Sequence, residues 1–543
     1  MSVRSLYFDY TTYDFTPPAE LTGGDAPRHP VVVVGGGPVG LAAALALVRR
    51  GVPTVVVHAG DGVGYGSRAA GTTRRSMEIL HRLGCSQPFM DIGVIWQGLR
   101  SFYRDKPVLA RDYEEKVPEQ FPGFLNVQQC FTEQFLIDAL LADPLADIRW
   151  RSTVTGLTEE DDGVLLDVET PQGAYRLRAA WAVACDGAHS TVRDRLGLRY
   201  EGTSYEARYV IMDIKIDLDL PAYRYCWFDP PAFPGTTALM HRQPMDIWRI
   251  DYQIHSAADF EAELDEERAA RRVREHLAWL GVDEPWEIDC VSGYRAHAVS
   301  LPRYRVGHVV FAGDAAHLVP IFGIRGLNSG LEDIANLAWK LQYVIDGKAP
   351  AALLDGYADE RRHAALRNHE HASKSARFMS PATPGETAVR DAVLSLAVDH
   401  ETFGALVDPR QSAPVPLQGS SLNTPADGPN VVGSVLPNTR VSASEYLLDL
   451  LGADFTLLLR GDAEDPLAGT SLPDLRVVRL LDGPGEEPGP ADVDGRADAL
   501  FGGSGHRYLL IRPDQHVAAA WRELSVDRLR AALARATGKE SAS

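Results

Sequence analysis

The sequence predicts an α/β fold in which a parallel-sheet domain is interrupted by an antiparallel sheet and followed by a separate C-terminal unit. Residues 29–58 read as strand, glycine turn, helix and strand, the order of a βαβ unit. Residues 97–126 and 201–289 contain alternating and aromatic segments that are typical of antiparallel strands. A Pro/Ser/Gly-rich stretch at residues 410–430 predicts a linker before the last unit.

Composition narrows the classes of function. The chain has 543 residues, more than one ordinary core holds, so we expect two or three domains. Its net charge of -20 disfavours nucleic acid or an anionic membrane as a partner, although a small anionic substrate is compatible with it. No signal-like or membrane-spanning apolar run occurs, so we expect a soluble cytoplasmic protein. The five cysteines are scattered without a C-x-x-C pair, which predicts reduced structural thiols and no metal site.

The first motif is a glycine-rich turn that follows an apolar strand and opens an apolar helix. It reads Gly35, Gly36, Gly37, Pro38, Val39, Gly40. Gly35 permits the tight turn, Gly37 lets the backbone approach a pyrophosphate, and Gly40 allows close packing of helix and strand. This context favours nucleotide binding over a plain glycine-rich turn.

The second strand of this unit ends at His58, where an acid that binds the adenosine ribose is usual. A neutral imidazole can still accept one hydrogen bond. His58 is therefore a candidate ribose contact, with a merely tolerated strand-end histidine as the alternative. Asp61 could substitute from the following loop.

Two further motifs also follow apolar strands. One runs from Cys185 to Arg193 and contains Asp186 and Gly187. The other begins at Gly313 and Asp314, which places a carboxylate at a strand tip where it can accept hydrogen bonds from a polyol. It continues through Pro320, Gly323 and Gly326 into the periodic helix 331–344, whose positive N-terminal end favours an anionic ring edge.

G-x-G-x-x-G, D-G-x-x-S-x-V-R and G-D-A-A-H, in this order and spacing, resemble the motifs of the group A flavoprotein aromatic hydroxylases, the family of p-hydroxybenzoate hydroxylase and phenol hydroxylase. The resemblance implies a Rossmann-like, glutathione reductase-type FAD-binding domain, an antiparallel β-sheet substrate domain that interrupts it, and a C-terminal thioredoxin-like domain. The expected boundaries are an N-terminal extension at 1–28, the FAD-binding domain at 29–96, 127–200 and 290–380, the substrate sheet at 97–126 and 201–289, the linker at 410–430, and the thioredoxin-like domain at 431–543. That last domain lacks C-x-x-C, so we expect packing or oligomerisation from it rather than dithiol chemistry.

The family reaction then implies the cofactors and partners. NAD(P)H, as a transient co-substrate, reduces FAD, O2 adds at C4a, and the resulting C4a-hydroperoxyflavin transfers oxygen to a phenolic or other aromatic substrate. A single dinucleotide fingerprint agrees with transient nicotinamide binding. Same-fold alternatives are epoxidation, Baeyer-Villiger oxidation or reduction, and a non-catalytic flavin-binding sensor or assembly protein is the alternative of another class. We expect a small aromatic substrate, with a homodimer as one expected assembly.

The resemblance also assigns cofactor contacts. Asp314 would bind the ribityl chain, and the Asp186-Gly187 loop would lie near the pyrophosphate and the nicotinamide. Arg68 would contact the cofactor, unless it is a solvated loop residue, and Gln129 would lie near the flavin chain, unless it only caps a helix. The full set of expected cofactor-binding residues is Gly35, Gly37, Pro38, Val39, Gly40, His58, Arg68, Gln129, Asp186, Gly187, Asp314, Pro320, Gly326, Leu327 and Asn328.

Catalytic and substrate residues are less sharply indicated. Ile324 and Arg325 depart from the glycine-rich run of many relatives, and we hypothesise that Arg325 favours the anionic reduced flavin or anchors an anionic substrate, against a surface-facing arginine. Pro320 would lie against the reacting edge of the flavin ring. The candidate catalytic residues are Arg325, Pro320, His241 and Tyr225, and the candidate substrate residues are Trp227, Arg242, Tyr294 and His297. Alternatively, Tyr225 and Trp227 only pack within the sheet, and His241 and Arg242 lie at an exposed strand end.

Overall fold

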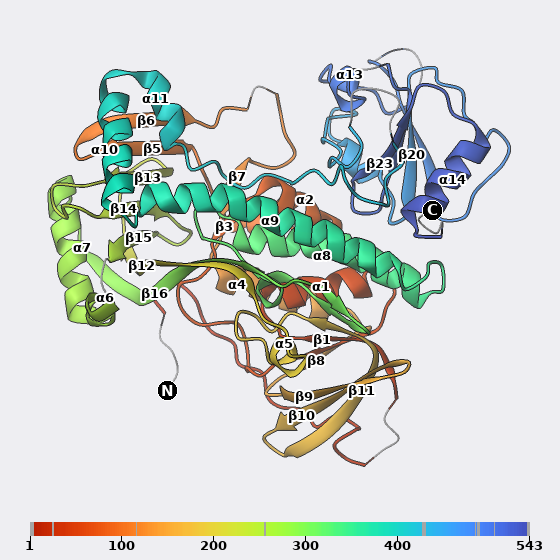
Figure 1. Ribbon diagram of the computed structural model, residues 1–543, viewed down its shortest axis with the longest axis horizontal. Coiled ribbons are helices and arrows are strands. Elements are labelled where there is room, and N and C mark those ends of the chain that lie inside the picture. The colour runs from red at the N-terminus through yellow and green to blue at the C-terminus, as the bar shows by residue number, and fades with distance from the viewer. Residues whose placement is uncertain are drawn as a thin grey trace.

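The computed structural model describes residues 5–23, 27–115, 117–254, 257–425, 431–483, 485, 489–503 and 505–539. Two eight-stranded sheets lie in its main body, and the long helices α8 (Gly326–Ile345) and α9 (Leu353–Met379) run past both of them (Figure 1). The C-terminal unit lies alongside the part of these helices where α8 ends and α9 begins (Figure 1). Residues 426–430 of the predicted linker lie outside the described residues.

The first sheet is built around β1 (His29–Val34), which pairs in parallel with β2 and β11. Its four valines are buried, as expected for a central strand covered on both faces. The path of the sheet is β17 (Arg305–Val306), β18 (Val309–Phe311), β11 (Gly173–Ala184), β1, β2 (Thr54–Val57) and β8 (Ala146–Arg149), and β10 (Gly163–Thr170) and β9 (Thr153–Glu160) extend from β11.

Helices bring the ends of these strands together. Helix α1 (Pro38–Val48) is apolar on every side, and its residues from Gly40 onward are all buried. It packs against α8 and α4 (Gln129–Leu141). The carboxyl ends of β1, β11 and β18, where parallel sheets bind ligands, therefore meet the start of α8. The smaller helices are α2 (Arg74–Arg82), α3 (Gln87–Ile92) and α5 (Thr191–Arg195), and a three-stranded sheet joins β3 (Gly71–Thr73), β7 (Phe124–Asn126) and β4 (Val94–Ile95).

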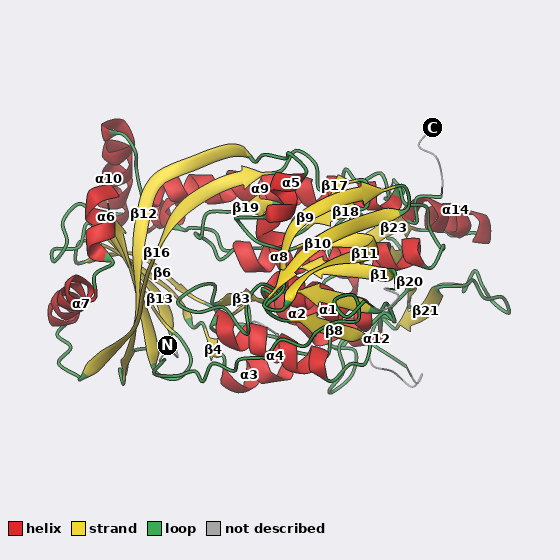
Figure 2. Cartoon of the chain, turned by 90° about the horizontal axis from the view of Figure 1, so that it is seen from below, coloured by secondary structure: helices red, strands yellow, loops and turns green. Residues whose placement is uncertain are grey.

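The second sheet is largely antiparallel, and its long strands β12 and β16 arch toward the first sheet (Figure 2). Its order is β19 (His317–Leu318), β16 (Trp286–Ser300), β12 (Glu201–Ile216), β15 (Ile247–Ile254), β14 (Thr237–Arg242), β13 (Tyr223–Phe228), β5 (Gly98–Tyr103) and β6 (Lys106–Asp112). Helices α6 (Ala257–Glu263) and α7 (Glu266–Leu280) lie outside it in Figure 2, and α10 (Pro384–Asp399) and α11 (Glu401–Val407) pack near β6.

The two faces of this sheet differ in chemistry because side chains alternate along a strand. Trp248, Ile250 and Tyr252 join an apolar core with Val273 and Leu277 of α7. The intervening residues of β15 are Arg249, Asp251 and Gln253, and they are buried on the opposite face. We call this opposite face, with its residues Arg224, His241, Arg249, Asp251 and Tyr294, the inner wall.

The C-terminal unit has a four-stranded sheet of order β21 (Leu475–Leu480), β20 (Phe455–Arg460), β22 (Tyr508–Ile511) and β23 (Val517–Trp521), with β20 parallel to β21 and the other pairs antiparallel. Its helices are α12 (Leu447–Leu450), α13 (Ala497–Leu500) and α14 (Val526–Ala536). This order agrees with a thioredoxin-like unit, which stays a prediction.

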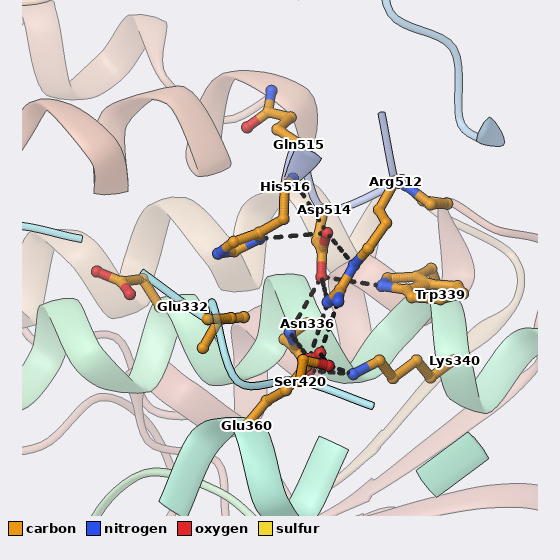
Figure 3. Close-up of polar contacts among 12 residues, drawn as sticks. Glu332, Asn336, Trp339, Lys340, Glu360, Ser420, Arg512, Asp514, Gln515 and His516 are labelled. Atoms are coloured by element: carbon orange, nitrogen blue, oxygen red, sulfur yellow. Dashed lines mark hydrogen bonds and ion pairs between the residues drawn. The ribbon is translucent and has the colours of Figure 1, made fainter. Parts of the chain in front are cut away.

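A buried polar network joins this unit to the main body (Figure 3). We call it the clamp; its charged members are Lys340 of α8, Glu360 of α9, and Arg512 and Asp514 of the β22–β23 turn. All four side chains are at most 2% exposed. The C-terminal unit is thus attached to the same helix that begins beside the carboxyl ends of the first sheet.

Candidate active site

A cavity of about 860 Å³ lies between the loops of the first sheet and the inner wall. On one side it is lined by the glycine turn, by residues 64–71 and by residues from Ala312 to Leu327. On the other side it is lined by the inner wall and by Trp96 and Asn126. The cavity therefore lies where the two sheets meet.

The glycine turn forms a cradle for a phosphate group. Gly35 has φ +107°, and a Cβ there would lie 2.4 Å from the Cys185 carbonyl oxygen, so only glycine fits. A Cβ at Gly40 would lie 1.9 Å from the Gly35 carbonyl oxygen. A Cβ at Gly37 would meet no atom within 4 Å, so this backbone faces open space at the N-terminus of α1, and Pro38 takes the first helical position.

His58 holds this turn through a hydrogen bond. Its Nδ1 accepts a hydrogen bond of 3.1 Å from the backbone N–H of Gly36, and the ring lines the cavity. Burial lowers the pKa of His58, so the imidazole is neutral at neutral pH and its proton is on Nε2. The alternative ribose contact, Asp61, forms an ion pair of 3.3 Å with Arg151.

Asp314 stands at the end of β18 with its carboxylate open to the cavity. Among the described residues no donor contacts this carboxylate, and burial raises its pKa. The loop around it is fixed by Asp333 of α8, which accepts hydrogen bonds from Gly313 N at 3.0 Å, from His317 Nε2 at 2.7 Å and from Arg361 Nε at 2.7 Å. The loop that carries the carboxylate is therefore fixed. Because no described residue bonds to the carboxylate, it can accept a hydrogen bond from a ligand hydroxyl.

The Asp186 loop is built around the short helix α5. Asp186 Oδ2 accepts a hydrogen bond of 3.1 Å from Val192 N, and Ser190 caps the helix by accepting one of 3.0 Å from Arg193 N. Gly187 lines the cavity with φ +78°, whereas Asp186 itself points back into its loop. The motif thus presents backbone to the cavity.

Residues 64–71 cover another side of the cavity. Gln129 Oε1 accepts a hydrogen bond from Ala69 N at 3.3 Å and its Nε2 donates to Glu133 at 2.8 Å, so Gln129 both lines the cavity and secures the loop. Arg68 is exposed to the cavity, and its Nε donates to the Tyr65 carbonyl at 3.2 Å. Its guanidinium has no ion pair in the part of the chain that the structure describes.

The turn before α8 is strained. Ile324 is β-branched and has φ +53°, a conformation that costs on the order of 1–3 kcal/mol. Asn328 holds it, because its Nδ2 donates to the Ile324 carbonyl at 2.6 Å and its Oδ1 accepts from Thr73 N at 2.9 Å. A strained residue held by such bonds at a cavity wall is typical of a ligand-binding turn.

Arg325 follows this turn as the N-cap of α8 and is 3% exposed. Its Nη1 donates to Asn368 Oδ1 at 2.9 Å and its Nη2 donates to the Arg410 carbonyl at 2.5 Å. Burial lowers its pKa to about 10, so it is charged at neutral pH, and its Nε has no acceptor. The guanidinium ties residues 410–411 to the start of α8, and its proposed influence on a flavin stays a prediction.

These features fit FAD. The glycine cradle leaves room for a pyrophosphate, Asp314 offers an unpaired acceptor for a polyol, and the start of α8 supplies a positive helix end. The cofactor would run from His58 through the glycine turn to the residues around Gly326 and Leu327.

The inner wall faces this predicted flavin site with polar groups that mostly lack partners. Arg249 forms a two-pronged ion pair with Asp213, at 2.9 and 3.2 Å, and donates to the Arg68 carbonyl at 2.6 Å. Asp251 Oδ1 and the Tyr294 hydroxyl are buried without a hydrogen-bond partner. Burial raises the pKa of Asp251 to about 6, although Arg249 and Arg224 act against this rise.

Comparison with known proteins agrees with this geometry. The family described as FAD binding domain matches residues 28–372. The chain belongs to the group A flavoprotein aromatic hydroxylases. It is 31% identical over 373 residues to the para-nitrophenol 4-monooxygenase of a Pseudomonas species, which covers 68% of this chain and 91% of that protein.

Other matches extend over most of this chain. The chain is 27% identical over 514 residues to the 3-(3-hydroxy-phenyl)propionate/3-hydroxycinnamic acid hydroxylase of Mycolicibacterium smegmatis, with 90% of each chain covered. Among solved structures, the flavin-dependent monooxygenase PieE in complex with FAD and substrate is similar, with a TM-score of 0.77, 25% identity, and coverage of 95% of this chain and 100% of that one.

The predicted family, fold class and cofactor are confirmed by these matches. The protein is an FAD-dependent aromatic monooxygenase that uses NAD(P)H and O2. Among the described residues of the hydroxylase, no helix is both long and apolar enough to cross a membrane.

The structure brings most predicted site residues of the hydroxylase to one cavity. The predicted residues that line it are Gly37, Pro38, Val39, His58, Arg68, Gln129, Gly187, His241, Tyr294, His297, Asp314, Arg325, Gly326 and Leu327. Gly35, Gly40, Asp186 and Asn328 lie behind this lining and shape it. Pro320 is buried between Val319 and Ile321, which do line the cavity. Their individual roles stay predictions.

Tyr225, Trp227 and Arg242 are placed elsewhere. Tyr225 and Trp227 stack on each other at 5.7 Å, and Trp227 packs against His276 and Trp279 of α7 on the outer face of the sheet. Arg242 pairs with Asp246 at 3.2 Å near the surface. The physical reason is the two-residue period of a strand, which turns these side chains away from the wall that holds Arg224 and His241.

The sequence analysis missed Arg224, Arg249, Asp251 and Trp96. A signal was present in residues 247–254, IWRIDYQI, where three polar residues alternate with apolar ones. Alternation indicates two faces. The sequence alone could not tell that the polar face is buried against a cofactor cavity rather than exposed to solvent.

Proposed function

We propose that this monooxygenase hydroxylates a phenol whose ring lies between the start of α8 and the inner wall, with its hydroxyl group at Asp251. The observation that carries this proposal is the carboxylate of Asp251, which is 2% exposed, lines the cavity opposite the predicted flavin site and receives no hydrogen bond from the described residues. The oxygen of this carboxylate that faces the cavity can accept a hydrogen bond from a phenolic O–H. Tyr294, whose hydroxyl is also unpartnered, offers a second polar contact on the same wall.

Asp251 is suited to take the phenolic proton. Its pKa of about 6 means that the carboxylate is mainly ionised at neutral pH and yet is a stronger base than an exposed aspartate. The positive charge of Arg249 would stabilise the phenolate that forms. Deprotonation makes the ring more electron-rich, which is what oxygen transfer to the ring requires.

The remaining residues position the reactants. FAD, when bound, accepts hydride from NAD(P)H and supplies the oxygen chemistry. Arg249 donates a hydrogen bond to the loop of Arg68, so it fixes the position of the inner wall relative to the predicted flavin site.

Two of the relatives support a phenolic substrate. The Pseudomonas protein is a para-nitrophenol 4-monooxygenase, and the Mycolicibacterium protein is a 3-(3-hydroxy-phenyl)propionate/3-hydroxycinnamic acid hydroxylase. All three compounds carry a phenolic hydroxyl, which is the group that Asp251 would receive.

A screen of phenols tests the proposal. The FAD-loaded enzyme should oxidise NAD(P)H faster when the right phenol is added, and the product should gain one atom from 18O2. Methyl ethers of the same phenols, which cannot donate a proton to Asp251, should fail to gain oxygen. Equal turnover of phenols and their methyl ethers would contradict the role of Asp251, and turnover of neither would contradict aromatic hydroxylation of a phenol.

We also propose a cytoplasmic location and a homodimer. The five cysteines are all free, which suits a reducing compartment in which NAD(P)H is available. Light scattering on the purified protein measures its mass in solution, and a single-chain mass would rule out the dimer.

A further inference from the structure

We infer that Arg224 is the binding residue for a carboxylate on the substrate, so that the enzyme acts on a phenolic acid rather than on a neutral phenol. This inference rests on the proposed function, because it describes the same cavity and names the second group that the substrate presents to it.

Arg224 is a buried cation without an anion. Its side chain lies on β13, it is 8% exposed, and it lines the cavity. In the described part of the chain, no carboxylate and no carbonyl or side-chain oxygen lies within hydrogen-bonding distance of its guanidinium, and the Trp96 ring lies 5.6 Å from its Cζ. A ring face offsets only a small part of the cost of burying a charge.

The neighbouring arginine provides the contrast. Arg249 stands on the same wall with comparable burial, but Asp213 neutralises it and the Arg68 carbonyl takes a further N–H. Arg224 has no such partner on its other side either, since there it borders a small, mainly apolar cavity lined by residues such as Leu99, Phe228 and Met379. The unpaired positive charge therefore faces the substrate cavity.

Two more donors without acceptors stand beside Arg224. Tyr225 pairs with Met240 across β13 and β14, so Arg224 and His241, one step further along, are neighbours on the same face. Gln243 Nε2 donates to His241 Nε2 at 3.1 Å, which leaves the proton of the neutral ring on Nδ1, and Nδ1 is buried without an acceptor. The indole N–H of Trp96 is likewise buried and unpaired. Both of these nitrogens are enclosed by protein and add positive dipoles around the guanidinium, and the guanidinium itself lines the cavity and makes the site for an oxyanion.

A planar carboxylate suits this site, because a guanidinium binds it through two parallel hydrogen bonds. Strands β13 and β15 flank β14, and Asp251 lies two residues along β15 from the position opposite Arg224, so Arg224 and Asp251 start from backbones about 12 Å apart. A substrate that reaches both would carry its acid on a short chain, away from the phenolic hydroxyl.

Matched acids and amides test this inference on the FAD-loaded, full-length enzyme. The pairs are 3-(3-hydroxyphenyl)propionate and its amide, and 3-hydroxybenzoate and 3-hydroxybenzamide, with stimulated NAD(P)H oxidation and 18O incorporation as readouts. We expect kcat/KM for the better acid to exceed that of its amide by at least about 30-fold, the loss that follows when one partner of a buried charge pair is removed.

Variants of Arg224 test whether this residue causes the preference for acids over amides. Arg224→Gln should raise KM for the acid by about 30-fold or more and leave the constants of the amide nearly unchanged. Arg224→Lys should restore part of the affinity for the acid. Arg100→Gln is the control, since Arg100 lies on the adjacent strand β5, where it pairs with Asp112 and packs over Tyr223. Bound FAD and the melting temperature show whether each variant is folded.

The alternative outcomes are distinct. If amides or neutral phenols are hydroxylated as well as the acids, or if Arg224→Gln weakens acid and amide equally, Arg224 does not bind a carboxylate while the proposed function stands. If Arg224→Gln instead raises KM for NAD(P)H alone, the anion is a cofactor phosphate and the inference is wrong. If no phenol of either kind is hydroxylated, the proposed function itself fails.

Discussion

The clamp and the inner wall are both buried, charged regions of this protein, and they differ in how their charges are satisfied. In the clamp, Glu360 accepts hydrogen bonds from Arg512 at 2.6 and 2.8 Å and from Lys340 at 2.6 Å, and Trp339 and Asn336 donate to Asp514 (Figure 3). On the inner wall, Arg224 and one oxygen of Asp251 have no such partners among the described residues.

The difference separates structural charges from ligand-binding ones. Two cations and two anions of the clamp are matched inside the protein, so nothing is left over for a ligand. The unmatched groups of the inner wall carry a cost in the free protein that a bound molecule can recover. Mutations in the clamp should therefore act on stability, and mutations at the unmatched groups should act on binding and catalysis.

Glu360→Gln should produce the largest effect on stability. Removal of this charge leaves Lys340 buried without a carboxylate and Arg512 with Asp514 alone, which should lower the free energy of unfolding by about 3–5 kcal/mol. Urea unfolding of the apoprotein measures it. Glu370→Gln is the matched control on the same helix, where the side chain is half exposed, and it should change stability by less than about 0.5 kcal/mol. Similar losses in both variants would contradict a structural role for the clamp.

Asp251→Asn should act on catalysis instead. Because burial raises the pKa of Asp251 to about 6, its base form accumulates as pH rises through this value, and kcat/KM of the unaltered enzyme should rise through pH 6 and then level. The variant should lose about 100-fold in kcat/KM at pH 8 and should lose this rise. Asp246→Asn, at the nearby surface hairpin, is the control. A pH profile that Asp251→Asn leaves in place would assign the proton to another group.

The same raised pKa affects stability with the opposite sign. In the folded protein Asp251 holds its proton between about pH 4 and pH 6, where an unfolded aspartate has lost it. Stability from this group is thus present at acid pH and is lost as pH rises through 6, so Asp251→Asn should unfold at equal or higher urea concentration than the unaltered protein at pH 8.

Asp314→Ala should weaken FAD binding while the apoprotein stays folded. The carboxylate has no partner within the described residues, so its removal takes away contacts made only with the cofactor, and we expect affinity for FAD to fall by about 10- to 100-fold. Fluorescence titration of the apoprotein with FAD gives this value. An apoprotein that loses stability as much as Glu360→Gln would show that Asp314 is a structural residue.

Among these variants, Arg224→Met should change the free energy of unfolding least, and the sign of the change shows whether Arg224 has a partner in the protein. The side chain has no oxygen partner to lose, so replacement of the buried charge by an apolar side chain of similar length should leave the free energy of unfolding unchanged or raise it by about 1 kcal/mol. Urea unfolding beside Glu360→Gln makes the comparison direct. A loss of several kcal/mol would mean that Arg224 has a protein partner.

Sequence reasoning reached the cofactor side of the site more fully than the substrate side. Gly35, Gly37 and Asp314 belong to motifs with fixed local spacing, and their geometry follows from a strand end and a helix start that are adjacent in the chain. His241 and Tyr294 were found as candidates on the inner wall, but Tyr225 and Trp227 were selected for their aromatic character and lie on the other face. Asp251 was missed because its importance depends on what lies opposite it.

The sequence by itself determined the family, the cofactor, the parallel sheet and the cofactor-binding turns, because these depend on residues that are close together in the chain. Only the tertiary structure decided which charges are matched. Lys340, Glu360, Arg512 and Asp514 come together from distant segments and their charges cancel, whereas Arg224 lies in a cavity wall where no described residue forms an ion pair with it. The cost of a buried charge is set by its neighbours in space, and a linear pattern of residues does not contain that information.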